Sequence, residues 1–168
     1  MLQSQVEVVS QALEVLNELS SEEYQQVLTP HFSGSIGQHI RHIIDHYLAL
    51  QTGSLSGVVD YNQRNRDSNI ELSVAVAIEA LQAIQRWLQT LSADVLAQSV
   101  TVSSEISVTQ QVNQRCVSTL AREVMFVSSH AIHHYSLIAI IRSLQGKSVP
   151  DLFGYAPATV SYMSANGE

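Results

Sequence analysis

Apolar residues recur at helical spacing in four long segments of the chain, and this pattern restricts the fold more than any other feature of the sequence. The first segment places them alternately four and three positions apart, at Leu2, Val6, Val9, Leu13 and Leu16. This spacing puts the apolar side chains on one face of a helix. We expect that helix to end before Thr29–Pro30, because the residue before a proline is disfavoured in the helical region.

The next two segments carry helix boundary signals in addition to their periodicity. Ser35 is expected to begin the second helix, Gln38 completes a capping box with it, and Gly53 is expected to end the helix. Ser68 and Glu71 have the same spacing and predict the start of the third helix. That third helix has the most regular apolar stripe of the four.

The fourth segment is predicted to be a helix that opens near Ser118 or Thr119 and runs to Gly146, and a brief helix is expected near 158–163. Four amphipathic helices of such length bury their stripes only against one another. The expected fold class is therefore all-α. It is a four-helix bundle with at least one long crossover, formed as a single domain over residues 1–168.

Two connections between these helices are informative. Residues 54–67 are polar and are expected to form a loop. Residues 99–109 alternate β-branched and polar side chains around a turn-like segment at 103–105. This alternation indicates a short hairpin or an extended crossover.

Charge and cysteine content restrict the expected binding partners and the expected cellular compartment. The chain has 168 residues, with 8 Lys and Arg against 15 Asp and Glu, and a formal charge of −7. Nucleic acid and anionic membranes need a basic face, so neither is an expected partner. The uncharged stretch 124–141 contains histidines and serines, which is unlike a bilayer span. The single cysteine, Cys116, and an acidic N-terminal segment without an export signal predict a cytoplasmic protein.

Histidines provide the strongest indication of function. Six of the seven fall into two clusters, one on the second helix and one on the fourth: His39, His42 and His46, then His130, His133 and His134. Each cluster borders the apolar face of its helix. His130 and His134 are four residues apart, so they present two imidazoles to one ion. A third histidine from the second helix would complete a three-ligand site with an open position.

The alternative is that these histidines only satisfy hydrogen bonds in the core. Two clusters that both border apolar stripes favour the metal site over this interpretation. Periodicity alone does not choose among His39, His42 and His46 as the third ligand, because all three share one stripe.

Two segments resemble a known family. Residues 35–46 resemble the second-helix motif of the DinB/YfiT-like superfamily of small bacterial four-helix proteins, and residues 122–135 are similar to its later His-x-x-x-His helix. The resemblance covers nearly the whole chain. It implies an up-up-down-down bundle and a divalent metal, zinc or nickel, held by His42, His130 and His134.

The resemblance also implies a range of functions. Characterised members include thiol-dependent transferases and isomerases, and many members dimerise. We therefore expect a metal-dependent enzyme that activates water or a thiol, as a hydrolase or a thiol-dependent transferase acting on a small molecule, with a thiol cosubstrate in the second case. A homodimer is expected, and the apolar stripe of the third helix is one surface for it.

Two other functions compete with the enzyme. One is a non-enzymatic metal- or small-ligand-binding protein of stress response, which would use the same histidines without a general base. The other is a structural interaction protein whose histidines merely satisfy the core.

Several residues near the histidines are candidates for substrate binding. His39 and His46 are expected around the metal ligands, while Tyr61 and Arg64 lie in the loop after the second helix. An arginine there suits a carboxylate or phosphate group. The alternative is that the loop arginines are solvated and pair with the neighbouring aspartates.

Glu123 is the candidate catalytic residue. It lies seven residues, about two helical turns, before His130. It would act as a general base or orient a ligand histidine. The alternative is a structural ion pair with Arg41 or Arg122.

Overall fold

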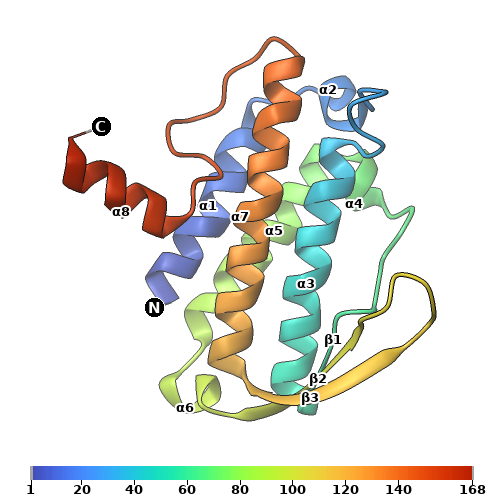
Figure 1. Cartoon of the computed structure of the whole chain (residues 1–168), viewed down its shortest axis with the longest axis vertical. Coiled ribbons are helices and arrows are strands. Elements are labelled where there is room, and N and C mark those ends of the chain that lie inside the picture. The colour runs from blue at the N-terminus through green and yellow to red at the C-terminus, as the bar shows by residue number, and fades with distance from the viewer. Residues whose placement is uncertain (1, 168) are drawn as a thin grey trace.

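The computed structural model describes residues 2–167. Four long helices make up most of the chain, and shorter helices and three strands connect them (Figure 1). In chain order the elements are α1 (Leu2–Asn17), α2 (Ser21–Gln25), α3 (Ile36–Ser56), β1 (Val58–Asp60), α4 (Asn69–Leu72), α5 (Val74–Thr90), α6 (Ala93–Leu96), β2 (Ser99–Glu105), β3 (Asn113–Thr119), α7 (Leu120–Leu144) and α8 (Pro157–Asn166).

The long helices α1, α3, α5 and α7 pack around one apolar core. Both α1 and α3 pack against α5 and α7. Helices α1 and α7 run in one direction, and α3 and α5 run in the opposite direction (Figure 1). The up-up-down-down order is therefore not confirmed. Helices α3 and α7, which carry the two histidine clusters, lie side by side and antiparallel.

The all-α prediction needs a correction, because the chain also forms a small three-stranded sheet. Its order is β1-β2-β3, with β1 parallel to β2 and β2 antiparallel to β3. The hairpin over 99–119 replaces the predicted turn at 103–105, which lies inside β2, and the connection runs over 106–112. Strand β1 lies in the segment predicted to be a loop. The sheet closes one end of the bundle (Figure 1).

The start of α3 was predicted correctly, but its end was not. Ser35 accepts a hydrogen bond from the backbone of Gln38, whose side chain bonds back to Ser35. The helix passes through Gly53 and stops at Gly57, which has a φ of 77°. A Cβ at Gly53 would clash with Val59, so this glycine lets β1 approach the helix.

The third predicted helix is divided in two at Ser73. Ser68 makes no side-chain capping bond, and Ser73 instead accepts a hydrogen bond from Val76 to cap α5. The predicted partner of Ser68, Glu71, binds Arg41 instead. The apolar stripe of α5 is buried in the chain's own core, so it is not the surface for a dimer that the sequence indicated.

Helix α7 is the longest helix of the fold and lines the core along most of its length. By length and composition alone it is apolar enough to cross a membrane. Half of its most apolar stretch is buried inside the fold, which is typical of a core helix. Its N-cap is Thr119, as expected, and Gly146 has a φ of 73° just after its end.

Candidate metal centre

The antiparallel packing of α3 and α7 brings the two predicted histidine clusters together. Histidines at successive turns of α3 face histidines at successive turns of α7, so that the rings of five residues are in contact: His39, His42, His46, His130 and His134. The sixth, His133, is exposed at the edge, with its ring centroid 5.4 Å from that of His134.

Two of the predicted ligands lie close to the third, His130. Nε2 of His130 lies 3.0 Å from Nε2 of His42 and 3.2 Å from Nε2 of His134. In a tetrahedral zinc site with the usual Zn–N bond length, ligand nitrogens are about 3.3 Å apart. These two distances are close to the spacing of nitrogens that share a divalent ion.

His46 is a second candidate for the third ligand. One ring nitrogen from each of His42, His46 and His130 lies within 4.8 Å of the others. Nδ1 of His46 is 2.9 Å from the backbone oxygen of His42, so Nδ1 carries the proton and Nε2 keeps its lone pair. His42 and His130 thus belong to both candidate ligand sets, which differ in having His134 or His46 as the third member.

His39 contacts the ring of His134. Their Nδ1 atoms are 2.9 Å apart. When His134 donates this bond, its Nε2 keeps the lone pair that a metal requires. Nε2 of His39 is buried and has no hydrogen-bond partner among the described residues.

Burial keeps the cluster uncharged. Burial first, and then the neighbouring histidines, lower the pKa of His42 to about 2, of His134 to about 3 and of His130 to about 4. Burial is also the main reason why the pKa values of His39 and His46 are lowered. Neutral imidazole is the form that binds a metal, so the site needs no deprotonation near neutral pH.

Tyr61 and Glu123 form a support beside the cluster. The ring of Tyr61 stacks on His46, with centroids 5.1 Å apart, and its hydroxyl donates to Oε2 of Glu123 at 2.8 Å. The buried carboxylate also accepts from Ser118 and Arg122. Glu123 hydrogen-bonds no histidine among residues 2–167, so it reaches the cluster only through Tyr61. Of the two predicted ion pairs, the one with Arg122 is present.

Arg64 lies in the loop after β1, close enough for its charge to lower the pKa values of His42, His46 and His130. Among the described residues it forms no ion pair, so the predicted alternative of pairing with Asp60 or Asp67 is not seen. Its Nη1 is buried without a hydrogen-bond partner.

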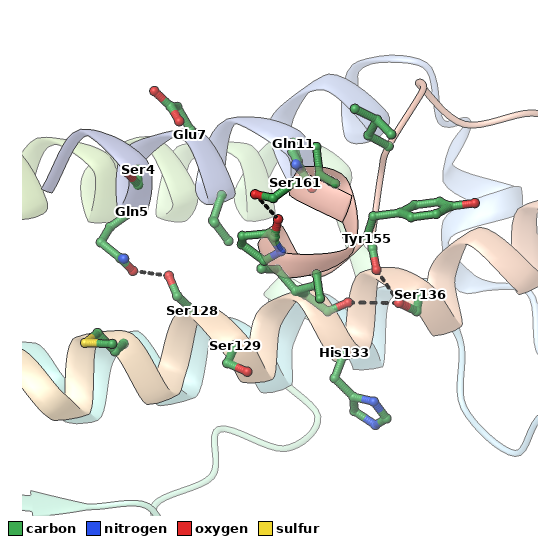
Figure 2. A pocket seen from close by; sticks show the side chains of 18 residues that line it. Ser4, Gln5, Glu7, Gln11, Ser128, Ser129, His133, Ser136, Tyr155 and Ser161 are labelled. Atoms are coloured by element: carbon green, nitrogen blue, oxygen red, sulfur yellow. Dashed lines mark hydrogen bonds between the residues drawn. The ribbon is translucent and has the colours of Figure 1, made fainter. Parts of the chain in front are cut away.

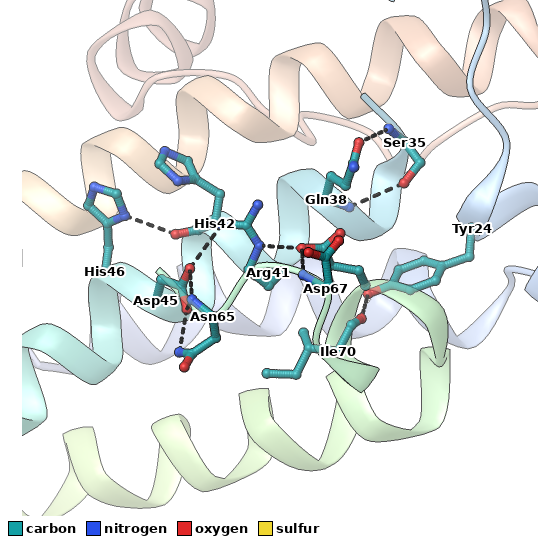
Figure 3. A network of polar contacts seen from close by, with 11 residues as sticks. Tyr24, Ser35, Gln38, Arg41, His42, Asp45, His46, Asn65, Asp67 and Ile70 are labelled. Carbon is teal, nitrogen blue, oxygen red and sulfur yellow. Dashed lines mark hydrogen bonds and ion pairs between the residues drawn. The ribbon is translucent and has the colours of Figure 1, made fainter. Parts of the chain in front are cut away.

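A buried polar network beside the site was missed from the sequence. Arg41 bridges Asp45 and Glu71 at 3.0 and 2.9 Å, and Asn65 donates to Asp45 at 2.7 Å (Figure 3). Phe126, stacked on His130, was missed as well. The i, i+4 spacing of Arg41 and Asp45 was the only signal available in the sequence.

A cavity lies elsewhere in the fold. It has a volume of about 860 Å³ and lies between α1, α7 and the segment that leads into α8. Figure 2 shows serine and glutamine side chains along it, with Gln5 and Ser128 in contact. His133 is the only member of the two histidine clusters that lines it.

Comparisons with known proteins bear on the family and the fold of this chain. A sequence profile of the DinB family matches residues 1–154. The fold is similar to the crystal structure of a DinB-like protein, YjoA, from Bacillus subtilis, with a TM-score of 0.55 and 16% identity over 88% of this chain and 98% of that chain. The sequence is also similar to FK506-binding protein 5 of Rhizopus delemar, with 30% identity over 114 residues. That match covers 68% of this chain but only 30% of the fungal protein, so the chain spans less than a third of this relative.

Proposed function

Since the chain belongs to the DinB family, we propose that it is a divalent-metal-dependent enzyme whose ion is held by histidines of α3 and α7. The observation that carries the proposal is the close approach of histidine nitrogens from α3 and α7: Nε2 of His130 lies 3.0 Å from that of His42 and 3.2 Å from that of His134, and His42, His46 and His130 form a group that could hold a metal ion. Three neutral imidazoles leave the ion its full charge and suit zinc or nickel.

The proposed reaction is hydrolysis of a small molecule or transfer of a thiol cosubstrate to it. A divalent ion bound there lowers the pKa of a coordinated water or thiol and so supplies an anionic nucleophile near neutral pH. The protein's own part is to hold the imidazoles neutral, to keep His46 oriented through Tyr61 and the backbone of His42, and to bind substrate beside them. We assign substrate contacts to Tyr61, Arg64, His39 and His46.

One observation favours a second candidate, a non-enzymatic metal- or small-ligand-binding protein of stress response. The carboxylate of Glu123, the residue predicted as general base, already accepts hydrogen bonds from Tyr61, Ser118 and Arg122. A carboxylate so engaged is better suited to positioning Tyr61 than to removing a proton. Replacement of Glu123 would leave the binding function intact.

Assembly and compartment are parts of the same proposal. We propose a cytoplasmic homodimer without nucleic-acid or membrane partners. Exposed apolar side chains of α7, among them Phe126, Ile140 and Leu144, support a contact between two copies. Light scattering of the purified protein tests it, and a monomeric mass at micromolar concentration contradicts it.

Elemental analysis of protein purified without a chelator tests the metal site. The wild type is expected to carry about one divalent ion per chain. A triple alanine variant of His42, His130 and His134 should carry none while its circular dichroism stays helical. His133→Ala is the matched control, because this exposed histidine lies on the same helix and should leave the metal content unchanged. A wild type that stays metal-free after loading with zinc and nickel refutes the proposal.

A further inference from the structure

Arg64 is a charged side chain with a buried donor that lacks a hydrogen-bond partner within residues 2–167. The residue is half-buried, and the unpartnered donor is its Nη1. Among residues 2–167 no carboxylate lies within 4.0 Å of the guanidinium. Burial of a guanidinium donor without an acceptor is unfavourable. The arrangement therefore favours a ligand that brings an acceptor to it.

The loop that carries Arg64 is held in place on both sides. After it, Asn65 donates to Asp45 from its side chain at 2.7 Å, and the backbone of Asp67 donates to Glu71 at 3.2 Å. Arg41 joins these two carboxylates from α3 (Figure 3).

Before Arg64, the loop is tied to the sheet and to α7. The backbone of Tyr61 donates to the oxygen of Ser103 at 3.0 Å, and the Tyr61 hydroxyl donates to Glu123. The position of Arg64 is thus largely fixed before a ligand binds, which reduces the entropy lost on binding.

These ties also place Arg64 beside the histidine cluster. Tyr61, three residues before it, stacks on His46, while Asp45, which holds Asn65, directly precedes His46 in α3. A positive charge held next to neutral imidazoles, and next to a cation when the site is loaded, selects an anionic ligand.

The shape of the guanidinium favours a carboxylate. Burial lowers the pKa of Arg64, and the nearby charges oppose one another: Asp45 and Glu105 raise this pKa, while Arg41 and Arg66 lower it. Arg64 itself has no ion-pair partner among residues 2–167. A planar carboxylate with a single charge matches the guanidinium through two parallel hydrogen bonds.

We propose that Arg64 anchors the carboxylate of a small-molecule substrate beside the histidine cluster, and this inference rests on the proposed function of that cluster as a metal centre. The substrate class is thus a small organic acid. Its carboxylate binds Arg64, and the rest of the molecule extends toward the open side of the metal site.

The test is an NMR titration of zinc-loaded protein with acetate, with acetamide as the neutral probe and phosphate as the doubly charged one. Acetate should bind the wild type more tightly than either. Arg64→Gln should weaken acetate binding about tenfold or more, as expected for a lost hydrogen bond to a charged group. Arg66→Gln is the matched control, because this arginine is exposed in the same loop and should change nothing. Arg64→Lys should give an intermediate affinity for acetate, because lysine keeps the positive charge but cannot donate two parallel hydrogen bonds to one carboxylate.

Equal acetate affinity in wild type and Arg64→Gln overturns the inference, as does tighter binding of phosphate or acetamide. Metal content is measured on the same samples. It distinguishes a failure of the Arg64 anchor from a failure of the proposed metal centre. Stoichiometric zinc with acetate binding independent of Arg64 refutes only the anchor. If the protein holds no zinc, the same titration of the metal-free protein still supports or refutes the role of Arg64, while the metal centre fails.

Discussion

Nε2 of His42 and Nε2 of His130 lie 3.0 Å apart, although the two residues are 88 positions apart in the chain. Only the antiparallel packing of α3 on α7 creates this proximity. Because both residues belong to each possible ligand set, they are the fixed part of the site, and the other histidines differ in what they add to it.

Single alanine variants should rank the histidines by role. We predict that His42→Ala and His130→Ala reduce zinc affinity more than about 100-fold, and His134→Ala by a similar factor, because each removes a ligand. His46→Ala should reduce zinc affinity only about 10-fold, as expected of a residue that supports a ligand without binding the metal itself. Competition with a chromophoric chelator measures these affinities. The reverse order for His46 and His134 would replace His134 by His46 in the ligand set.

Stability of the metal-free protein should fall on acidification. The folded protein holds the pKa values of His42, His134 and His130 at about 2, 3 and 4, below the ordinary value of 6.5 that applies to the unfolded chain. Between pH 6.5 and about 4 the unfolded state therefore binds more protons, and the free energy of unfolding decreases as the pH falls.

Urea denaturation at pH 7.5, 6 and 5 measures this effect. The triple alanine variant is the control and should lose less stability over the same range, because it lacks the three histidines. Equal pH dependence in the two proteins contradicts the assignment.

Replacement of Glu123 should separate its structural and chemical roles. Glu123→Gln weakens the bonds from Tyr61, Ser118 and Arg122 to a buried group, at a cost of about 1–3 kcal/mol of stability. Zinc content should not change, since the hydrogen bonds of Glu123 within the described part of the chain go to Tyr61, Ser118 and Arg122 and not to a histidine. Denaturant unfolding and elemental analysis check both statements. Loss of zinc from a folded Glu123→Gln protein would make this carboxylate part of the metal site.

The buried network of Arg41 should be essential to the fold beside the site. Arg41→Met leaves Asp45 and Glu71 without their shared cation, and removal of one partner of a buried ion pair costs about 3–5 kcal/mol. Arg86→Met, at an exposed position of α5, is the control and should lower the free energy of unfolding only slightly. Urea denaturation compares the two. A similar, small loss in both variants contradicts the prediction.

Local patterns were sufficient to predict the four long helices and the two histidine clusters, but not the separate short helices α2, α4 and α6. Periodicity and the capping box of Ser35 depend on neighbours within four residues, and the structure keeps both. Strand β1 was not predictable in this way, because Val58 pairs with Thr101, which lies far along the chain, and no local signal specifies that pairing. The role of Glu71 likewise depends on Arg41, which lies 30 positions away in the chain.

The two glycines near the end of α3 illustrate the same limit. Gly53 and Gly57 carry the same local stop signal, but only Gly57 adopts the left-handed conformation that ends the helix. Gly53 is required instead by the packing of β1 on the helix, where Val59 occupies the space of a Cβ. Nothing in the sequence around Gly53 shows that packing.

Gly53→Ala therefore tests the tertiary contact against helix propensity. Helix propensity alone predicts that alanine in place of glycine in a helix interior raises the free energy of unfolding by about 1 kcal/mol. We predict a net loss of about 1–3 kcal/mol, because the added methyl group forces Val59 and β1 away from α3. Gly34→Ala is the control, since the side chain of Gln38 that it meets can move. Urea denaturation gives both values, and a stabilised Gly53→Ala variant would show that β1 yields without cost and that propensity governs this position.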